Sequence, residues 1–220
     1  MRTKRYIALL LAALMALALT ACGAALKKDK KASMTIAPAQ LSEEERQLAE
    51  LLALGMDSYR IFDFQAKDAK SLEFNVYELA DGEWSRLPGG GGVGLSAEDG
   101  RIALTFGKMT DGVELTVQAG GANYSASVQI EPKDNVSGMT FATSSLDDAA
   151  AIELEQEIPL VLQVVTSKNE VRMYKVDYFG MPRELGKQDY EHVYAVTVTF
   201  SAQELGGASG PASAEPSPKD

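Results

Sequence analysis

The chain has 220 residues, of which 45% are hydrophobic and 24% charged; this is typical of a folded globular protein and excludes general disorder. Its formal net charge is −10, with 21 Lys and Arg against 31 Asp and Glu. So acidic a chain repels a phosphate backbone, which argues against any nucleic-acid partner.

The N-terminus has the pattern of an export signal. Arg2, Lys4 and Arg5 form a positive segment, and residues 7–19 are an apolar stretch of Ile, Ala, Leu and Met. This stretch is shorter than the roughly 20 residues that a membrane-spanning helix needs. Residues 1–21 are therefore predicted to be a signal peptide that is removed.

The apolar stretch ends in Leu19-Thr20-Ala21-Cys22. This motif resembles the bacterial lipobox, in which Leu is followed by two small residues and an obligatory Cys. The resemblance implies that the Cys22 sulfur receives diacylglycerol and that a peptidase then cleaves between Ala21 and Cys22. Two acyl chains anchor a protein stably, so we expect a lipoprotein on the extracytoplasmic face of the cell membrane. Ordinary signal cleavage and an uncleaved signal anchor are the alternatives.

Cys22 is the only cysteine in the chain. The exported domain therefore cannot form an internal disulfide, and an apolar core must stabilise it. Loss of the three basic residues of the signal leaves 18 Lys and Arg against 31 Asp and Glu, a net charge of −13.

Composition divides the exported chain into three parts. Residues 22–40 are small and polar with four lysines, and are predicted to be a flexible tether. Those lysines either lie on anionic lipid head groups or are simply solvated. Residues 41–201 are predicted to be a β-rich globular domain, with either a long connection or a domain boundary at 131–148. Residues 202–220 are rich in Gly, Ala, Ser and Pro and are predicted to be disordered.

A helix is predicted at the start of the globular domain. Ser42 and Glu45 have the spacing of a capping box, which begins a helix over residues 43–54. Its apolar side chains form one stripe: Leu48, Leu51 and Leu52. We expect this stripe to lie against a sheet, and a helix that binds a partner is the alternative.

Beyond residue 58 apolar residues recur at every second position, which is the period of a β-strand. The predicted strands are 59–64, 72–77, 101–106, 113–118, 124–130, 152–154, 158–166, 171–178 and 190–201. The predicted turns are Asp81-Gly82, Asp99-Gly100, Asp111-Gly112, Gly120-Gly121 and the hairpin turn 167–170, with one helical turn at 182–185. Short alternating strands predict a mainly β fold, an antiparallel β-sandwich with one N-terminal amphipathic α-helix.

The exported chain lacks the side chains for several kinds of catalysis. His192 is the only histidine and the only thiol is that of Cys22, which excludes Cys-His nucleophiles and multi-His or multi-Cys metal sites. By strand alternation His192 shares the apolar face of Tyr194 and Val196, so we interpret it as a histidine at the edge of the core. We predict no catalytic residue, no metal and no cofactor.

Two further patterns are interpreted as structural. Gly89, Gly91 and Gly94 match the spacing of a dinucleotide-binding loop, but no helix follows them, so we interpret the segment as a flexible loop. Acidic residues alternate with apolar ones over residues 152–158, which describes a solvated strand face: Glu153, Glu155 and Glu157. A glycan hydrolase needs two carboxylates across a cleft, and the sequence nominates no pair.

Trp84 and Tyr77 are the candidate ligand-stacking residues, because surface aromatic rings hold sugars on many β-sandwiches. If the loop is the two residues Asp81-Gly82, Trp84 faces Leu79 and shares the face of Tyr77. A three-residue loop with a bulge instead places Trp84 on the face of Val76. Burial of the indole favours the second register, with Trp84 in the core.

Together these features predict a lipid-anchored cell-surface lipoprotein, bound to the membrane through Cys22, whose β-sandwich binds an envelope glycan or a protein partner without catalysis. The alternatives are a carboxylate-dependent glycan hydrolase and an accessory subunit of a membrane complex.

The predicted address can be tested by mass spectrometry of the protein isolated from cells. We expect a chain that begins at Cys22 and carries acyl chains on that residue. A bare thiol at Cys22, or residues 1–21 still attached, would contradict the prediction.

Overall fold

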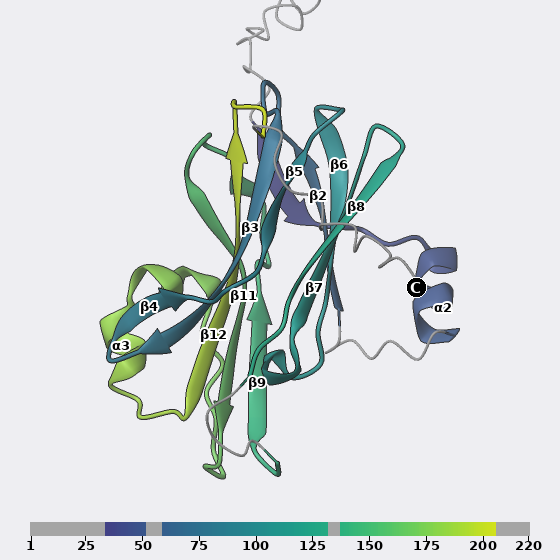
Figure 1. Ribbon diagram of the computed structural model, residues 1–220. Helices are drawn as coiled ribbons and strands as arrows, with labels where there is room; N and C mark the ends of the chain where they lie inside the picture. The colour runs from purple at the N-terminus through teal and green to yellow at the C-terminus, as the bar shows by residue number, and fades with distance from the viewer. Residues whose placement is uncertain (1–33, 52–58, 132–136, 206–220) are drawn as a thin grey trace, which may run out of the picture. The chain divides into compact units, whose positions relative to one another are not determined.

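The computed structural model describes residues 34–51, 59–131 and 137–205, and these form two antiparallel sheets packed together (Figure 1). Sheet A has the strand order β10 (Ala150–Ala151), β1 (Thr35–Pro38), β2 (Tyr59–Gln65), β6 (Asp99–Thr105), β7 (Val113–Ala119) and β8 (Ala122–Val128). Sheet B has the order β4 (Glu83–Arg86), β3 (Ser71–Ala80), β12 (His192–Ser201), β11 (Glu157–Thr166) and β9 (Thr140–Ser145), with β5 (Gly91–Gly94) also paired to β3. The predicted mainly β, antiparallel sandwich is confirmed.

The core between the sheets is built from the apolar residues that alternate along the strands. Sheet A contributes Phe62, Phe64, Ile102, Leu104, Leu115 and Val117, and sheet B contributes Leu72, Phe74, Val76, Tyr194, Val196, Val198 and Phe200. Each such side chain stabilises the fold by roughly 1.5–3 kcal/mol when it leaves water. The face predicted for the last strand, Tyr194 to Phe200, is confirmed as an inner face.

Strand β11 changes its alternation at a β-bulge between Pro159 and Val161. A bulge inserts one residue, so Leu160 and Val161 both belong to the core between the sheets. Beyond the bulge Leu162 and Val164 belong to a second apolar cluster on the outer face of sheet B. Residues 160–165 are apolar except for Gln163, so β11 is apolar on both faces, and the bulge decides which residues face each side.

Gln163 is a buried polar residue that ties the two sheets together. Its Oε1 accepts the amide of Met109 at 2.7 Å, where the short helix η1 (Met109–Asp111) follows β6. Its Nε2 donates to the Thr143 hydroxyl in β9 at 2.8 Å and to the Gly107 carbonyl at 3.3 Å. The bond to Met109 satisfies a buried amide, and the three bonds together satisfy both polar atoms of the fully buried Gln163 side chain.

Residues 167–191 cover the outer face of sheet B. They contain the short helices η2 (Val176–Gly180) and α3 (Pro182–Gly186), and α3 lies beside β4 (Figure 1). The helical turn predicted at 182–185 is confirmed. The predicted strand 171–178 and hairpin turn 167–170 are wrong, because this segment packs its apolar residues on Leu162, Val164 and Val193 instead of pairing as a strand.

Several other segments differ from their predictions. Asp99 and Gly100 are the first residues of β6 and not a turn. The glycine-rich segment predicted as a flexible loop contains β5, which pairs with β3. A Cβ at Gly90 would lie 2.4 Å from the Phe74 carbonyl oxygen, so the close approach of two backbones explains a glycine there.

The segments predicted to flank the domain also contribute to it. Strand β1, within the predicted tether, pairs with β2, and the Ser71 hydroxyl donates to the Gln203 carbonyl within the predicted tail. Strand β9 lies in residues 131–148, and β3 pairs with β12, so strands from both sides of that segment share sheet B. Residues 22–33 and 206–220 lie outside the described residues.

Helix α2 (Glu43–Leu51) has the predicted capping box. The Ser42 amide donates to the Glu45 carboxylate at 2.7 Å, and the Glu45 amide donates to the Ser42 hydroxyl at 3.2 Å. The expectation that its leucines lie against a sheet is wrong for Leu48 and Leu51, which are 56% and 81% exposed; Leu52 lies outside the described residues. In the described part of the chain, no helix has the length and apolar character to cross a membrane.

Substitution Gln163→Leu should destabilise the fold by about 1–3 kcal/mol, because it leaves the buried Met109 amide without a partner. Urea unfolding of the full chain measures this change. Gln118→Leu, at an exposed position of β7, is the matched control and should change the free energy of unfolding by less than about 0.5 kcal/mol. Equal stability of the two variants would contradict the assigned role of Gln163.

Candidate functional site

The hairpin that joins β3 to β4 fixes the position of the predicted stacking residues. Asp81 and Gly82 have φ of 52° and 76°, as a two-residue type I′ turn requires. Leu79 consequently pairs with Trp84, which shares the outer face of Tyr77. The two-residue register is therefore the correct one, and the expectation that Trp84 lies in the core between the sheets is wrong.

Trp84 is partly buried by the segment that covers sheet B, and its partner there is Phe179. The two rings stack with their centroids 5.2 Å apart at 25°, and Trp84 Nε1 donates to the Phe179 carbonyl at 2.7 Å. The Tyr77 ring meets the same Phe179 ring edge-on at 5.5 Å. We call these three rings the aromatic cluster. It brings both predicted stacking residues together around a phenylalanine that the sequence did not single out.

Next to the aromatic cluster, the exposed carboxylate of Glu157 is held in place by three donors. Its Oε1 accepts the Tyr77 hydroxyl at 2.7 Å, the Thr197 hydroxyl at 2.7 Å and Asn75 Nδ2 at 3.4 Å. These residues come from β11, β3 and β12, and we call the four residues the Glu157 patch. Burial, and next the Glu157 carboxylate, raises the pKa of Tyr77 to about 12, so its hydroxyl stays a donor at neutral pH.

Two more features belong to the Glu157 patch. Asn75 is 4% exposed, and its Oδ1 is a buried acceptor without a hydrogen-bond partner among the described residues. At the edge of the patch Arg86 NH2 lies 2.7 Å from Glu73 Oε1, and both side chains are half-exposed. The patch therefore combines acceptors, a guanidinium group and aromatic rings on an open sheet face.

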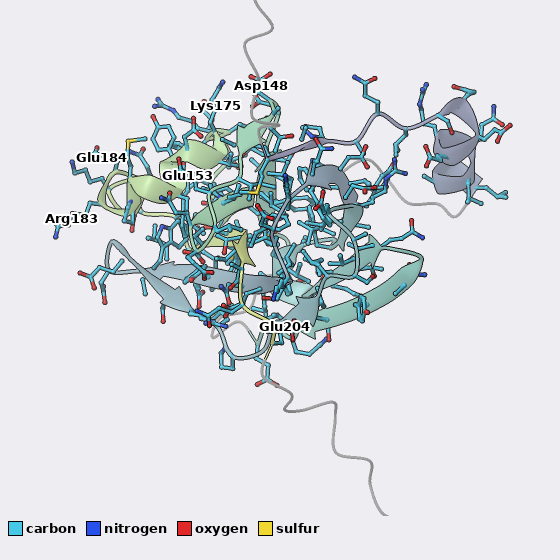
Figure 2. The ribbon with its side chains drawn as sticks, turned by 90° about the horizontal axis from the view of Figure 1, so that it is seen from above. Asp148, Glu153, Lys175, Arg183, Glu184 and Glu204 are labelled. Atoms are coloured by element: carbon cyan, nitrogen blue, oxygen red, sulfur yellow. The ribbon has the colours of Figure 1, made fainter. Side chains whose placement is uncertain are left out.

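A cleft of about 620 Å³ lies at the end of β3, between the β3–β4 hairpin, α3 and the start of β12. Its charged lining residues are Glu78, Asp81, Asp189, Glu191, Arg183, Lys187 and His192. Arg183 and Glu184 lie next to each other on α3 (Figure 2), and Arg183 Cγ would lie 3.7 Å from a Cβ at Gly82 in the hairpin. The cleft falls within the range of volumes that small ligands occupy.

His192 and Glu78 form a hydrogen-bonded pair in the wall of this cleft. His192 Nδ1 lies 2.9 Å from Glu78 Oε1, and the imidazole, 4% exposed, stacks on the Tyr194 ring at 10° with centroids 5.7 Å apart. Burial, together with the nearby Glu78 charge, raises the pKa of the Tyr194 phenol. The prediction that His192 lies at the edge of the core, on the face of Tyr194, is confirmed.

Glu191, at the rim of the cleft, is bonded to the end of β11. Its Oε1 accepts both the hydroxyl and the amide of Ser167, and the hydroxyl bond in particular lowers the pKa of Glu191 to about 2. A carboxyl with so low a pKa is ionised at neutral pH, so Glu191 is unsuited to act as the general acid of a glycosidase.

Comparison of the chain with protein-family models, with curated proteins and with solved structures finds no match.

Part of the candidate site could be predicted from the sequence, namely its two aromatic residues on β3 and β4. Trp84 and Tyr77 were singled out as aromatic residues near a turn, and they do share a face. Glu157 was interpreted as part of a solvated strand face, because nothing in the sequence reveals that donors from β3 and β12 converge on it. Glu78 was not singled out either, since its partner His192 is 114 residues away in the chain.

The Ser167–Glu191 contact predicts a specific pH dependence. A lowered folded-state pKa contributes stability that is complete above the ordinary value of 4.5 and is lost as the pH falls through about 2. Ser167→Ala should therefore lower the melting temperature by at most about 2–4 °C at neutral pH, since the pair is exposed, and by less as the pH approaches 2.

Thermal unfolding at several pH values measures this difference, with Ser127→Ala, at an exposed position of β8, as the control. A difference between wild type and Ser167→Ala that does not shrink with falling pH would contradict the assignment.

Proposed function

We propose that this chain is a lipid-anchored lipoprotein of the cell surface that binds an envelope glycan, without catalysis, on the outer face of sheet B. The carrying observation is the Glu157 carboxylate, which is exposed and yet receives hydrogen bonds from Tyr77, Thr197 and Asn75. The lipobox at residues 19–22 supports the anchor.

Three donors on an exposed carboxylate add little stability, because water would solvate the same oxygen. Their effect is to hold the carboxylate in one orientation before a ligand arrives. Side chains that are already ordered lose less entropy on binding, so a fixed acceptor favours affinity. The second carboxylate oxygen of Glu157, whose side chain is exposed, adds an acceptor for ligand hydroxyl groups.

The aromatic cluster beside Glu157 supports a glycan over a charged ligand. A sugar presents apolar C–H faces and hydroxyl edges, which match an aromatic ring next to hydrogen-bonding groups. Tyr77 supplies both elements, since its ring belongs to the cluster and its hydroxyl bonds Glu157. The paired Arg86 and Glu73 provide a donor and an acceptor at the edge of the same face.

The proposal is tested with the full-length lipoprotein in detergent, on a glycan array and on insoluble cell-wall material. Glu157→Gln should weaken glycan binding about tenfold or more, because hydrogen bonds to a charged group contribute about 1.5–3 kcal/mol. Tyr77→Phe, which keeps the ring, should weaken binding less than Tyr77→Ala.

Glu114→Gln, at an exposed position on the outer face of sheet A, is the control and should bind like wild type. Circular dichroism checks that each variant is folded. Unchanged binding by Glu157→Gln, absence of glycan binding by the wild type, or release of cleaved sugar would overturn the proposal.

A further inference from the structure

The cleft at the start of β12 contains the Glu78 carboxylate, whose orientation is fixed by a hydrogen bond with His192. Glu78 and Tyr77 are neighbours in β3, so their side chains point to opposite faces of sheet B. Glu78 therefore belongs to a different site from the Glu157 patch. Its side chain is 26% exposed, and its Oε1 is bonded to His192 Nδ1 at 2.9 Å.

The pairing with Glu78 determines what the buried imidazole of His192 offers. An ionised carboxylate only accepts hydrogen bonds, so His192 Nδ1 carries the proton. In the neutral imidazole, Nε2 is then an acceptor, and this atom is buried without a partner among the described residues. An unsatisfied buried acceptor destabilises the fold, and an apolar side chain at position 192 would avoid that cost. His192 is thus a poor choice for packing alone.

The Glu78 carboxylate determines which chemical class of ligand the cleft favours. The Glu78 carboxylate is the accessible acceptor, since its side chain is 26% exposed whereas His192 Nε2 is buried. An ammonium group supplies three donors and no acceptor, which matches a carboxylate. Lys168 Nζ lies 3.7 Å from Asp189 Oδ2, so that carboxylate is paired, and the lining still holds three further carboxylates against two cationic side chains. Of those two, Lys187 is paired with Glu184 at 2.7 Å.

The rest of the lining suits a small organic ligand better than a bare metal ion. Leu79, Leu185, Val193 and Tyr190 contribute apolar surface, and no group of three or more metal-binding side chains occurs among the residues that the structure describes. A cleft of about 620 Å³ is large enough for a monosaccharide or an amino acid.

We propose that this cleft binds a small ligand through a protonated primary amine, with Glu78 as the ion-pairing carboxylate and His192 as the residue that positions it. The site is independent of the proposed glycan-binding face, so either can fail without the other. An amino sugar and a simple alkylamine share the required chemistry, and the experiment separates them.

The single histidine makes the test specific to this site. Full-length protein labelled with ¹⁵N-histidine gives imidazole signals from His192 alone. Glucosamine, ethanolamine and N-acetylglucosamine are titrated in turn. N-acetylglucosamine is the control, because it is the uncharged analogue of glucosamine. We expect the His192 signals to show an Nδ1-protonated tautomer and to shift with an amine but not with N-acetylglucosamine. A shift with glucosamine alone identifies an amino sugar, and shifts with both amines identify the amine group as sufficient.

Glu78→Gln keeps the shape of the side chain and removes its charge, and should weaken amine binding at least about tenfold. Glu83→Gln, in the same hairpin but not in the cleft, is the matched control and should bind like wild type. Glu78→Asp provides a second variant should the first fail to fold. No His192 response to either amine, an equal response to N-acetylglucosamine, or full binding by Glu78→Gln would overturn the proposal.

Discussion

The structure depends on one constraint, namely that the central strands of sheet B are apolar on both faces. The inner side chains of β12 meet sheet A, whereas Val193 of β12 and Leu162 and Val164 of β11 face outward. A sheet in a two-layer sandwich normally leaves its outer face to water. Here that face is apolar at one end and must be covered, and residues 167–191 cover it.

This cover determines where both candidate sites lie. By packing on β11 and β12, the segment brings Phe179 against Trp84 and Tyr77, which orders the aromatic cluster beside Glu157. The same segment continues through α3, which approaches the β3–β4 hairpin closely. A Cβ on Gly186 would lie 3.0 Å from the Cα of Gly82. The cleft forms where α3 and the hairpin meet the start of β12. The segment that packs on the apolar outer face of sheet B therefore has a candidate polar site at each of its edges.

Each candidate site relies on a carboxylate that other side chains hold in place. Glu157 is held on an open face by hydroxyl and amide donors, and Glu78 is held in a cleft by an imidazole. Because consecutive residues of a strand alternate in direction, the Tyr77 and Glu78 side chains point to opposite faces of sheet B and serve different sites. A domain with a strongly negative overall charge can in this way present two carboxylates that differ in geometry and in the ligands they favour.

The features that depend on neighbouring residues in the chain could be predicted from the sequence. Alternation located most strands and the inner face of β12, the capping box began α2, and Asp81-Gly82 formed its turn, because each follows from local geometry. The sequence did not reveal how residues 171–178 fold, because the same apolar pattern suits a strand and an irregular segment that packs on a sheet. Only the tertiary structure decided that Trp84 stacks on Phe179 and that His192 meets Glu78. Those contacts join residues about 100 positions apart, and strand pairing and packing across the whole domain fix them.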